Sequence, residues 1–433
     1  MTFHIETLGC KVNIYESEMI RQKLLKANFQ EIDDVADVNI INTCSVTNTA
    51  DSKSRKLVRR YKRNNPNSIL IVCGCSSQNK TEEYQQMDID ILLGNNKKSD
   101  IVSLINEFKA NQKKYEFITT DRELNFEDMQ LEEYKNHTRA FVKIQDGCDN
   151  FCTYCIIPHV RGSIRSKKLE TAIEEINTLV KNGHQEIVLT GIHTGSYGTH
   201  LGYDLTDLIH EVSKLKNLKR IRISSIEITE LNEKFLNELK NNNKICDHLH
   251  IPLQTGTDEI LKRMNRKYDL NYYYHKIKTI RKIRPNINIT TDVIVGFPYE
   301  TEELFKQTLE FIKIINFSKI HAFPYSKRTG TPAANMPNQV NEIEKKQRNQ
   351  LLTELSNQLE IEYAKKHLDQ ELEVLIEEVN NEYSIGHTDN FIKIKVNQVL
   401  EKNKFYRIKP IEISKEILIS EIKEMRDKNE SYF

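Results

Sequence analysis

The first part of the chain alternates short apolar runs with helical patterns. FHIETLG, VNIIN, SILIVCG and DILLG are rich in β-branched residues and predict four strands, and segments at about 16–27, 50–64 and 98–110 predict helices between them. Strands that alternate with helices in this way form a parallel sheet covered by helices. We therefore expect an N-terminal α/β parallel-sheet domain over residues 1–114.

A charged stretch without a clear period, 115–139, predicts a linker, and a second alternating region follows it. Helical segments separate six strand candidates: 140–145, 186–190, 220–224, 249–254, 289–297 and 319–325. Six β/α units make up three quarters of a TIM barrel, whose chemistry takes place at the carboxyl ends of the strands. The second domain, 138–367, is therefore predicted to be a partial (β/α)6 TIM-like barrel.

The last segment, 368–433, changes to a period of two. ELEVLIEEV, FIKIKV, FYRIKP and EILISEI are separated by Asn and Gly turns and predict a small antiparallel β-barrel. Basic and aromatic side chains are interleaved there: Lys393, Lys395, Lys402, Lys404, Arg407 and Lys409 with Phe391, Phe405 and Tyr406. Many small barrels bind RNA through such residues, so Lys393 and Lys395 are candidate RNA contacts. An ordinary barrel with solvated lysines is the alternative.

Composition narrows the classes of protein. The 433 residues suffice for two or three domains, and 63 basic against 62 acidic residues leave no global charge that would indicate nucleic-acid binding. The N-terminus lacks the pattern of a signal peptide, and no apolar stretch is long enough to span a membrane. We therefore expect a reducing, cytoplasmic location and no membrane partner.

One segment departs from this charge balance. Residues 51–63, DSKSRKLVRRYKR, hold seven basic residues and one acidic residue. On a helix, Arg55, Arg59 and Arg63 would share one side at i, i+4 spacing. These three arginines are candidate contacts for RNA phosphates, with an ordinary solvated face as the alternative.

Three of the eight cysteines, Cys148, Cys152 and Cys155, form a C-x3-C-x2-C run. In a long chain without a signal peptide, cysteines are expected to be thiolate ligands or buried spares rather than disulfides. Three thiolates can hold three irons of a four-iron cluster and leave the fourth iron for S-adenosylmethionine (SAM). Zinc is the alternative, although its sites usually take four ligands built from C-x2-4-C pairs.

Three further cysteines, Cys10, Cys44 and Cys75, each follow a predicted strand of the first domain. The carboxyl ends of parallel strands meet at one edge of the sheet, where ligands bind. We therefore expect these cysteines to converge on a second three-thiolate site. Three buried structural cysteines are the alternative.

Eight ordered motifs along the chain resemble the methylthiotransferases of the radical SAM superfamily. They are TLGCKVNIYESE (7–18), INTCSVTNTADSKSRK (41–56), CGCSSQ (73–78), DGCDNFCTYCIIPHVRG (146–162), LTGIHTGSYG (189–198), LHIPLQTGTDEILKRMNRKY (249–268), DVIVGFPYET (292–301) and FPYSKRTGTPAA (323–334). The resemblance implies an N-terminal domain with its own cluster, a radical SAM barrel and an RNA-binding TRAM domain. By resemblance, Cys10, Cys44 and Cys75 hold an auxiliary 4Fe–4S cluster, and Cys148, Cys152 and Cys155 hold the SAM-cleaving one. Cys73 and Cys246 have no place in the pattern and are expected to be buried spares.

The family has three branches, which modify isopentenyladenosine in tRNA, threonylcarbamoyladenosine in tRNA, or an aspartate of a ribosomal protein. GCKVN and NTCSVTNTADSKSR resemble the threonylcarbamoyladenosine branch more than the GCQMN and NTCAVRE text of the first branch, and GHTDNFIKIKV (386–396) agrees. The resemblance implies methylthiolation of carbon 2 of threonylcarbamoyladenosine at position 37 of tRNA, with two SAM molecules and two 4Fe–4S clusters. An electron donor and a sulfur donor are implied as partners. Tyr299, Ser163 and Ile164 depart from the usual family text.

Breaking an unactivated aromatic C–H bond is beyond acid–base side chains, so the cofactors carry the chemistry while the protein positions the substrate and excludes water. Gly191, Glu227 and Gln254 lie at predicted carboxyl ends of barrel strands and are candidate SAM contacts; caps or turns are the alternative. A competing hypothesis is a non-catalytic RNA-binding protein whose clusters are structural. A structural cluster has four protein ligands, whereas each predicted site offers three.

Overall fold

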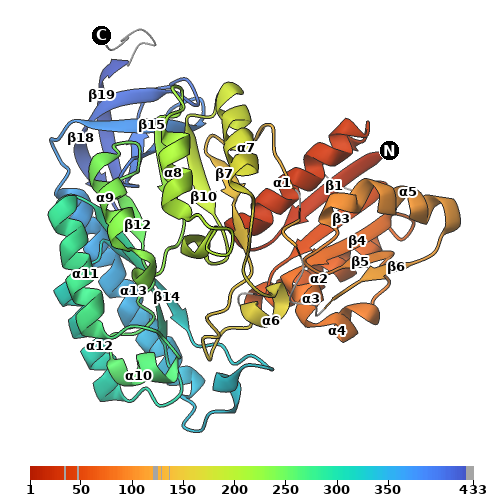
Figure 1. Cartoon of the computed structure of the whole chain (residues 1–433), viewed down its shortest axis with the longest axis horizontal. Helices are drawn as coiled ribbons and strands as arrows, with labels where there is room; N and C mark the ends of the chain where they lie inside the picture. The colour runs from red at the N-terminus through yellow and green to blue at the C-terminus, as the bar shows by residue number, and fades with distance from the viewer. Residues whose placement is uncertain (34–35, 46–47, 120–124, 128, 136, 426–433) are drawn as a thin grey trace.

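The computed structural model describes residues 1–33, 36–45, 48–119, 125–127, 129–135 and 137–425. Figure 1 shows three parts in chain order: an N-terminal sheet with its helices, a larger open barrel, and a small C-terminal barrel. The fold class predicted from the sequence is confirmed for all three parts. Throughout the described residues, no helix combines the length and the apolar character that crossing a membrane requires.

Six parallel strands form the N-terminal sheet in the order β2-β1-β3-β4-β5-β6. They are β1 (Thr2–Thr7), β2 (Gln30–Glu31), β3 (Val38–Thr43), β4 (Ile69–Gly74), β5 (Ile91–Leu93) and β6 (Tyr115–Phe117). The sequence does not predict β2 or β6. The expected linker over 115–139 is wrong at its start, because Tyr115–Phe117 pairs with β5; such a short strand carries no detectable period.

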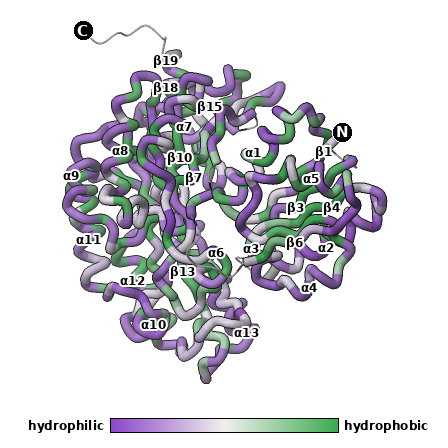
Figure 2. The backbone as a smooth tube through the Cα atoms, turned by 45° about the vertical axis from the view of Figure 1, so that its right-hand side comes forward, coloured by the Kyte–Doolittle hydropathy of each residue, from purple (hydrophilic) through white to green (hydrophobic). Residues whose placement is uncertain are grey.

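Helices cover both faces of this sheet. The helices α1 (Lys11–Lys26) and α5 (Ile101–Asn111) pack on one face, and α2 (Asn48–Asn64) and α4 (Thr81–Gln85) pack on the other. Neighbouring residues of a strand point to opposite faces, so two-sided cover explains why the central strands are almost wholly apolar. Figure 2 shows these strands as hydrophobic tubes inside a mostly hydrophilic outline. Two short helices, α3 (Cys75–Asn79) and η1 (Lys98–Asp100), complete this part.

The six strands predicted for the partial barrel are confirmed. They are β7 (Ala140–Lys143), β10 (Glu186–Thr190), β11 (Arg220–Ile223), β12 (His248–His250), β13 (Asn288–Val295) and β14 (Lys319–Pro324). They form two parallel three-stranded sheets, β11-β10-β7 and β12-β13-β14. Parallel bridges between Ile221 and Ile245 and between Ser225 and His250 join the two sheets into one open arc.

Helices and short elements connect these strands. The helices are α6 (Ile157–Arg161), α7 (Leu169–Lys181), α8 (Leu205–Ser213), α9 (Glu233–Asn241), α10 (Asp258–Arg263), α11 (Leu270–Ile283), α12 (Glu302–Ile315) and α13 (Glu342–Lys365). The short elements are β8 (Gln145–Asp146), β9 (Arg165–Ser166), η2 (Thr194–Ser196), η3 (Ile228–Glu230) and η4 (Pro332–Asn335).

The inside of the open arc is polar. Ile187, Ile221 and Leu249 belong to the apolar core under the helices, so the alternate residues of these strands face inward. Those residues are Glu186, Arg222, His248 and His250, and the paired strands β13 and β14 add Asp292 and His321. A closed TIM barrel fills its interior with branched apolar side chains, whereas this arc presents charges and imidazoles to its inside.

The C-terminal part is a closed five-stranded barrel in the order β15-β16-β17-β19-β18. The strands are β15 (Leu372–Val379), β16 (Ser384–Thr388), β17 (Lys393–Val396), β18 (Phe405–Ser414) and β19 (Ile417–Met425). The sequence does not predict β16, whose central glycine weakens its alternation. All pairs are antiparallel except β17 with β19, which is parallel and closes the barrel.

This small barrel docks at the amino ends of the larger barrel's strands. Arg222 donates hydrogen bonds to the carbonyls of Thr388 and Asp389 over 3.2 and 2.9 Å. The ring of Phe391 stacks on His248 at 5.0 Å, and Arg220 lies 4.7 Å from the ring of Phe405.

The aromatic side chains expected on an RNA-binding face are therefore placed differently. Phe391 and Phe405 contact the larger barrel, and Tyr406 lies in the core of the small one. The expected aromatic RNA face is wrong for these three residues.

Candidate metal centre

The loop that carries Cys148, Cys152 and Cys155 runs from β8 to α6 in a tight curve. The Cys148 amide donates to the carbonyl of Gly162 over 3.1 Å, and the Cys155 amide donates to the carbonyl of Cys152 over 2.9 Å. Gly147 has a positive φ of 73°, and a Cβ there would lie 1.9 Å from the Ser163 carbonyl oxygen. Only glycine fits this position, so the local sequence itself bends the chain toward one centre.

Cationic side chains surround these three cysteines. Arg266 donates from Nη1 to the Sγ of Cys152 over 3.3 Å and from Nη2 to Glu227. Burial lowers the pKa of His193, but hydrogen bonds to Cys148 and Glu230 outweigh that effect and raise the pKa to about 10. Such donors stabilise thiolates and the negative charge of a bound cluster.

Cys10, Cys44 and Cys75 follow β1, β3 and β4, which are neighbours in the sheet. Gly9, at a φ of 107°, lies against Cys44, since a Cβ there would stand 2.7 Å from its Sγ. Burial raises the pKa of Cys10, and the neighbouring Cys75 raises it further. The structure therefore brings the three strand-end cysteines together.

A single guanidinium joins this second set of cysteines to the barrel. Arg161, the last residue of α6, donates from Nε to the Sγ of Cys75 over 3.2 Å and from Nη2 to Asn13 over 3.0 Å. Its Nη1 lies 3.0 Å from Glu16 and 3.1 Å from Asp146. Burial alone raises the pKa of Glu16, but Arg161, Lys143 and Lys98 outweigh it and hold the pKa well below its usual value.

The two sets of cysteines face each other across the domain boundary. Cys75 packs against Ile156, the residue after Cys155, and against Val160. Arg328 donates to the Ser45 carbonyl, next to Cys44, and acts electrostatically on both Cys44 and Cys155. Both sets therefore lie at the carboxyl ends of their strands, close to the contact between α6 and α3 that Figure 1 shows.

The residues present fit iron–sulfur clusters better than zinc. Each set offers three soft thiolates with cationic donors around them. A zinc ion needs its ligands about 2.3 Å from one point. A structural zinc site also usually takes four protein ligands, whereas each set offers three cysteines.

The three candidate SAM contacts lie at the carboxyl edge of the barrel. Gly191 follows β10, and a Cβ there would lie 2.8 Å from Oε1 of Gln145. Glu227 shares Arg266 with Cys152, which places its carboxylate beside the cysteine loop. Gln254 has a positive φ of 69°, and its amide donates to the Asp292 carbonyl over 2.8 Å.

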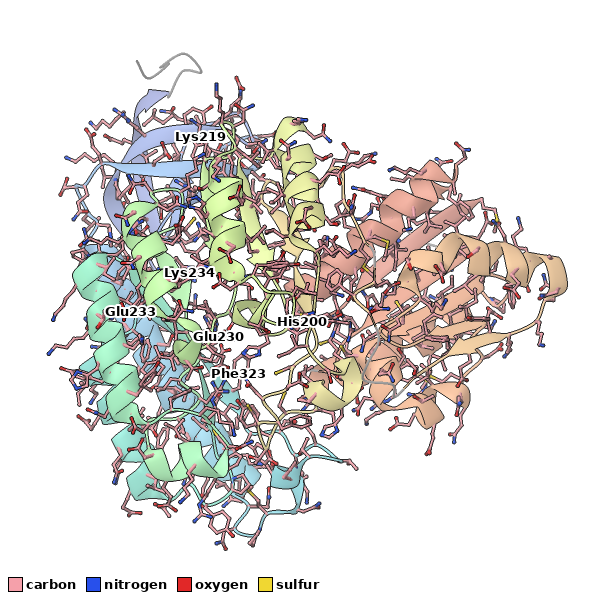
Figure 3. The ribbon with its side chains drawn as sticks, in the orientation of Figure 1. His200, Lys219, Glu230, Glu233, Lys234 and Phe323 are labelled. Atoms are coloured by element: carbon pink, nitrogen blue, oxygen red, sulfur yellow. The ribbon has the colours of Figure 1, made fainter. Side chains whose placement is uncertain are left out.

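Several side chains near this centre have solvent access. Cys10 and Lys11 are exposed, and so are His321 and Phe323 on the inward face of β14. Figure 3 labels Phe323 and Glu230 within the larger barrel.

The candidate RNA contacts lie on two separate surfaces. Arg59 and Arg63 are exposed on α2, whereas Arg55 lies 2.6 Å from Asp51 and 3.1 Å from Glu83. Lys393 and Lys395 point outward from β17, where Lys395 lies 4.3 Å from the ring of Tyr383. Figure 1 shows α2 and the C-terminal barrel well apart.

The remaining cysteines contribute to the apolar core. Cys73 packs in the main core of the N-terminal sheet, and Cys246 is buried near Arg222. Burial raises the pKa of each thiol to about 12, which leaves both protonated and unreactive.

Sequence reasoning missed the cationic residues of the centre. Arg161, His193, Arg266 and Arg328 lie within the motifs PHVRG, LTGIHTG, MNRKY and PYSKRTG, but nothing in their spacing links them to the cysteines. The only sequence signal was that most of these basic residues lie within a few positions of a cysteine or of a predicted strand end.

Comparisons with known proteins agree with this geometry. Residues 142–312 match the family described as Radical SAM superfamily, and residues 2–94 match Uncharacterized protein family UPF0004. The chain is 43% identical over 373 residues to the threonylcarbamoyladenosine tRNA methylthiotransferase MtaB of Bacillus subtilis (strain 168), covering 85% of this chain and 82% of that protein. It is 37% identical over 373 residues to a tRNA-2-methylthio-N(6)-dimethylallyladenosine synthase of Thermoanaerobacter sp. (strain X514), covering 83% and 79%.

One solved structure with a similar fold is the radical S-adenosylmethionine methyltransferase TsrM of Kitasatospora setae. It aligns with a TM-score of 0.55 at 10% identity, over 77% of this chain and 73% of that one, which shows the fold alone. The fold and the cysteine loop define a radical SAM enzyme, which uses a 4Fe–4S cluster and SAM. Within that class, the chain belongs to the radical SAM tRNA methylthiotransferases.

Proposed function

We propose that this enzyme methylthiolates carbon 2 of threonylcarbamoyladenosine at position 37 of tRNA, with two SAM molecules and two 4Fe–4S clusters. The observation that carries the proposal is the arrangement of two three-cysteine sets that face each other across the domain boundary. In each set, three thiolates leave one iron open for a further ligand. An electron donor and a sulfur donor are required as partners.

The choice of nucleoside rests on two observations. The relative that is 43% identical is named for threonylcarbamoyladenosine, and the relative named for dimethylallyladenosine is 37% identical. The inside of the arc presents the polar pair of Asp292 and His250, 3.2 Å apart, which suits a polar threonylcarbamoyl group. An apolar isopentenyl group would instead favour an apolar pocket.

The protein's own residues position the reactants. When bound, the cluster at Cys148, Cys152 and Cys155 supplies the electron that cleaves SAM to a radical. Arg266, through its contacts with Cys152 and Glu227, fixes the cysteine loop against the carboxyl edge of the barrel. Gly191, Glu227 and Gln254 are proposed SAM contacts at that edge. Arg161 and Arg328 hold the Cys10, Cys44 and Cys75 set against the barrel.

We further propose that tRNA contacts Arg59, Arg63, Lys393 and Lys395. All four side chains have solvent access and lie outside the metal centre. Arg55 contributes less, because Asp51 and Glu83 already neutralise its charge.

Mass analysis of tRNA nucleosides tests the proposal. Cells that contain the protein should convert threonylcarbamoyladenosine to a product heavier by one CH2S unit, and cells without it should not. Gain of that unit on isopentenyladenosine instead would assign the enzyme to the other tRNA branch. If neither nucleoside gains this unit although the purified protein cleaves SAM, the assignment of tRNA as the substrate is wrong.

A further inference from the structure

The inner face of the open arc carries two imidazoles that meet across β13. His250 of β12 and His321 of β14 lie on either side of that strand, and their ring centroids are 5.5 Å apart. Asp292 of β13 is the register partner of His321, and its Oδ1 lies 3.2 Å from Nε2 of His250. The strands β12, β13 and β14 therefore each contribute one residue to a single cluster.

This cluster faces solvent rather than the core. His321 is exposed, the Asp292 side chain is 31% exposed, and Phe323, on the same face of β14, is 41% exposed. Ile320, by contrast, is buried in the core with Leu352 of α13. Because neighbouring residues of a strand point to opposite faces, the exposed side chains lie on the inner face of the arc, where a ligand can reach them.

The hydrogen-bonding capacity of the cluster is only partly used. Both ring nitrogens of His250 have partners, since Nδ1 lies 2.9 Å from Oγ1 of Thr290 and Nε2 lies beside Asp292. Among the described residues, no hydrogen bond reaches either ring nitrogen of His321. Partial burial lowers the pKa of His321, and His250 lowers it further, so the neutral ring presents one N–H donor and one acceptor. An uncharged group with both donors and acceptors suits this cluster, because the Asp292 carboxylate would repel an anion.

The cluster lies near the two sets of cysteines. His321 lies three residues before the end of β14, which corresponds to about 10 Å of strand. Arg328, just beyond this strand, donates to a backbone carbonyl of the loop that carries Cys44. The Asp292 carbonyl accepts from the amide of Gln254, a proposed SAM contact, over 2.8 Å. A group bound at the cluster is therefore close to the proposed SAM site and to the auxiliary set.

We propose that His321 and Asp292 hydrogen-bond the carbamoyl part of the threonylcarbamoyl group and thereby select this nucleoside, an inference that rests on the proposed function. The carbamoyl part has N–H donors and a carbonyl acceptor, which match the acceptor of Asp292 and the donor of His321. An isopentenyl group has neither, so its binding would leave both side chains without partners, which costs free energy. His250 is a positioning residue, because its Nε2 holds the Asp292 carboxylate.

Two anticodon stem-loop RNAs test this role, one with threonylcarbamoyladenosine and one with isopentenyladenosine at the same position. The holoenzyme should bind the first RNA about tenfold more tightly than the second, as measured by fluorescence anisotropy. His321→Phe should reduce this ratio by about fivefold, because it keeps a ring but removes the hydrogen bonds. His321→Gln, which has a donor and an acceptor, should retain most of the ratio.

His275→Phe is the matched control. It makes the same exchange at an exposed histidine of α11 and should keep the wild-type ratio. Each ratio compares two ligands on one preparation, so partial loss of intact protein leaves the ratio unchanged.

A third RNA identifies the atoms that His321 contacts. Glycylcarbamoyladenosine keeps the carbamoyl part of the group but lacks the threonine hydroxyl. His321→Phe should weaken the binding of this RNA as much as that of the threonylcarbamoyladenosine RNA. If it weakens only the latter, the contact is to the hydroxyl, and the proposed carbamoyl contact is wrong.

The outcomes separate this inference from the proposed function. If His321→Phe keeps the wild-type ratio while the wild type methylthiolates the threonylcarbamoyladenosine RNA, the role of His321 is wrong and the proposed function stands. If the wild type methylthiolates only the isopentenyladenosine RNA, the proposed nucleoside and the role of His321 are both wrong.

Discussion

The Nε of Arg161 donates to the Sγ of Cys75 over 3.2 Å, although the two residues belong to different domains. The same guanidinium contacts Asn13, Glu16 and Asp146, so it is fully engaged in a buried network. This one side chain therefore contacts a proposed cluster ligand and, at the same time, links the N-terminal sheet to the barrel.

Arg161→Lys should weaken the auxiliary site without removing charge. A lysine cannot reproduce the planar fork, so the Cys75 thiolate loses its donor. In a Cys148, Cys152 and Cys155 to Ala background, where only the auxiliary site remains, iron release to a chelator should be about 10- to 100-fold faster. Arg165→Lys is the control, because Arg165 lies 3.1 Å from Asp146 and no hydrogen bond joins it to a described thiol. Equal release rates for both variants would contradict the role of Arg161.

Replacing Cys148, Cys152 and Cys155 by alanine should remove one cluster of two. After anaerobic reconstitution, iron should fall from about eight to about four per chain, and SAM cleavage should stop. Iron analysis and assay of 5′-deoxyadenosine measure both quantities. The variant Cys246→Ala is a control, because that thiol lies in the core. Continued SAM cleavage by the triple variant would show that the radical-generating site lies elsewhere.

Cys44→Ala should separate radical formation from sulfur insertion. Cys44 belongs to the N-terminal set, so the variant should still form 5′-deoxyadenosine but attach no methylthio group to tRNA. Chromatography of both products from one reaction makes the comparison. A near-normal yield of methylthiolated tRNA would mean that Cys10, Cys44 and Cys75 are structural.

The exposed arginines of α2 should account for part of the salt dependence of tRNA binding. Arg59→Gln with Arg63→Gln should flatten the slope of log K against log salt by about one and a half to two units. Arg55→Gln should have a smaller effect, since Asp51 and Glu83 hold that side chain. Binding titrations at several salt concentrations test both. A slope that the double variant leaves unchanged would make α2 an ordinary solvated face.

The buried pair of Glu186 and Arg222 should make stability depend on acid pH. Burial raises the pKa of Glu186, but Arg222 and Arg220 outweigh it and bring the pKa from 4.5 to about 2. A depressed pKa stabilises the fold above pH 4.5, and that contribution, about 3 kcal/mol, is lost as pH falls from 4.5 to about 2.

Glu186→Gln tests this pH dependence. The variant should be about 3–5 kcal/mol less stable at neutral pH, because it leaves Arg222 buried without its carboxylate. The difference in the free energy of unfolding between wild type and variant should become smaller as the pH falls. Unfolding followed by circular dichroism at several pH values measures it. A difference that stays constant down to pH 3 would contradict the low pKa.

Much of this architecture is predictable from local pattern. The sequence predicts strands that are bounded by turn residues and separated by helices, and Cys10, Cys44 and Cys75 follow the ends of three of them. The parallel sheet then brings these three cysteines together. The six strands of the partial barrel were predicted for the same reason. Local pattern fails for β2 and β6, which are only two and three residues long, and for β16, where Gly386 interrupts the alternation.

The contacts between domains are not predictable in this way. Phe391 belongs to an alternating run that suits an exposed face, yet it stacks on His248 because the small barrel docks there. Arg161 contacts Cys75, which lies 86 positions away in the sequence, and no local spacing encodes this contact. Long-range packing decides these roles, and it enters only with the tertiary structure.

The network around Glu16 also bears on how the protein matures during synthesis. Glu16 and Lys98 emerge from the ribosome first, but the other partners of Glu16, Lys143 and Arg161, belong to the barrel and follow later. Until α6 has docked, the Cys75 side of the N-terminal sheet stays open. The carboxylate of Glu16 then lacks two of its three cationic partners. The N-terminal sheet therefore gains its complete set of ion pairs around Glu16 only after the barrel segment with Lys143 and Arg161 has been synthesised.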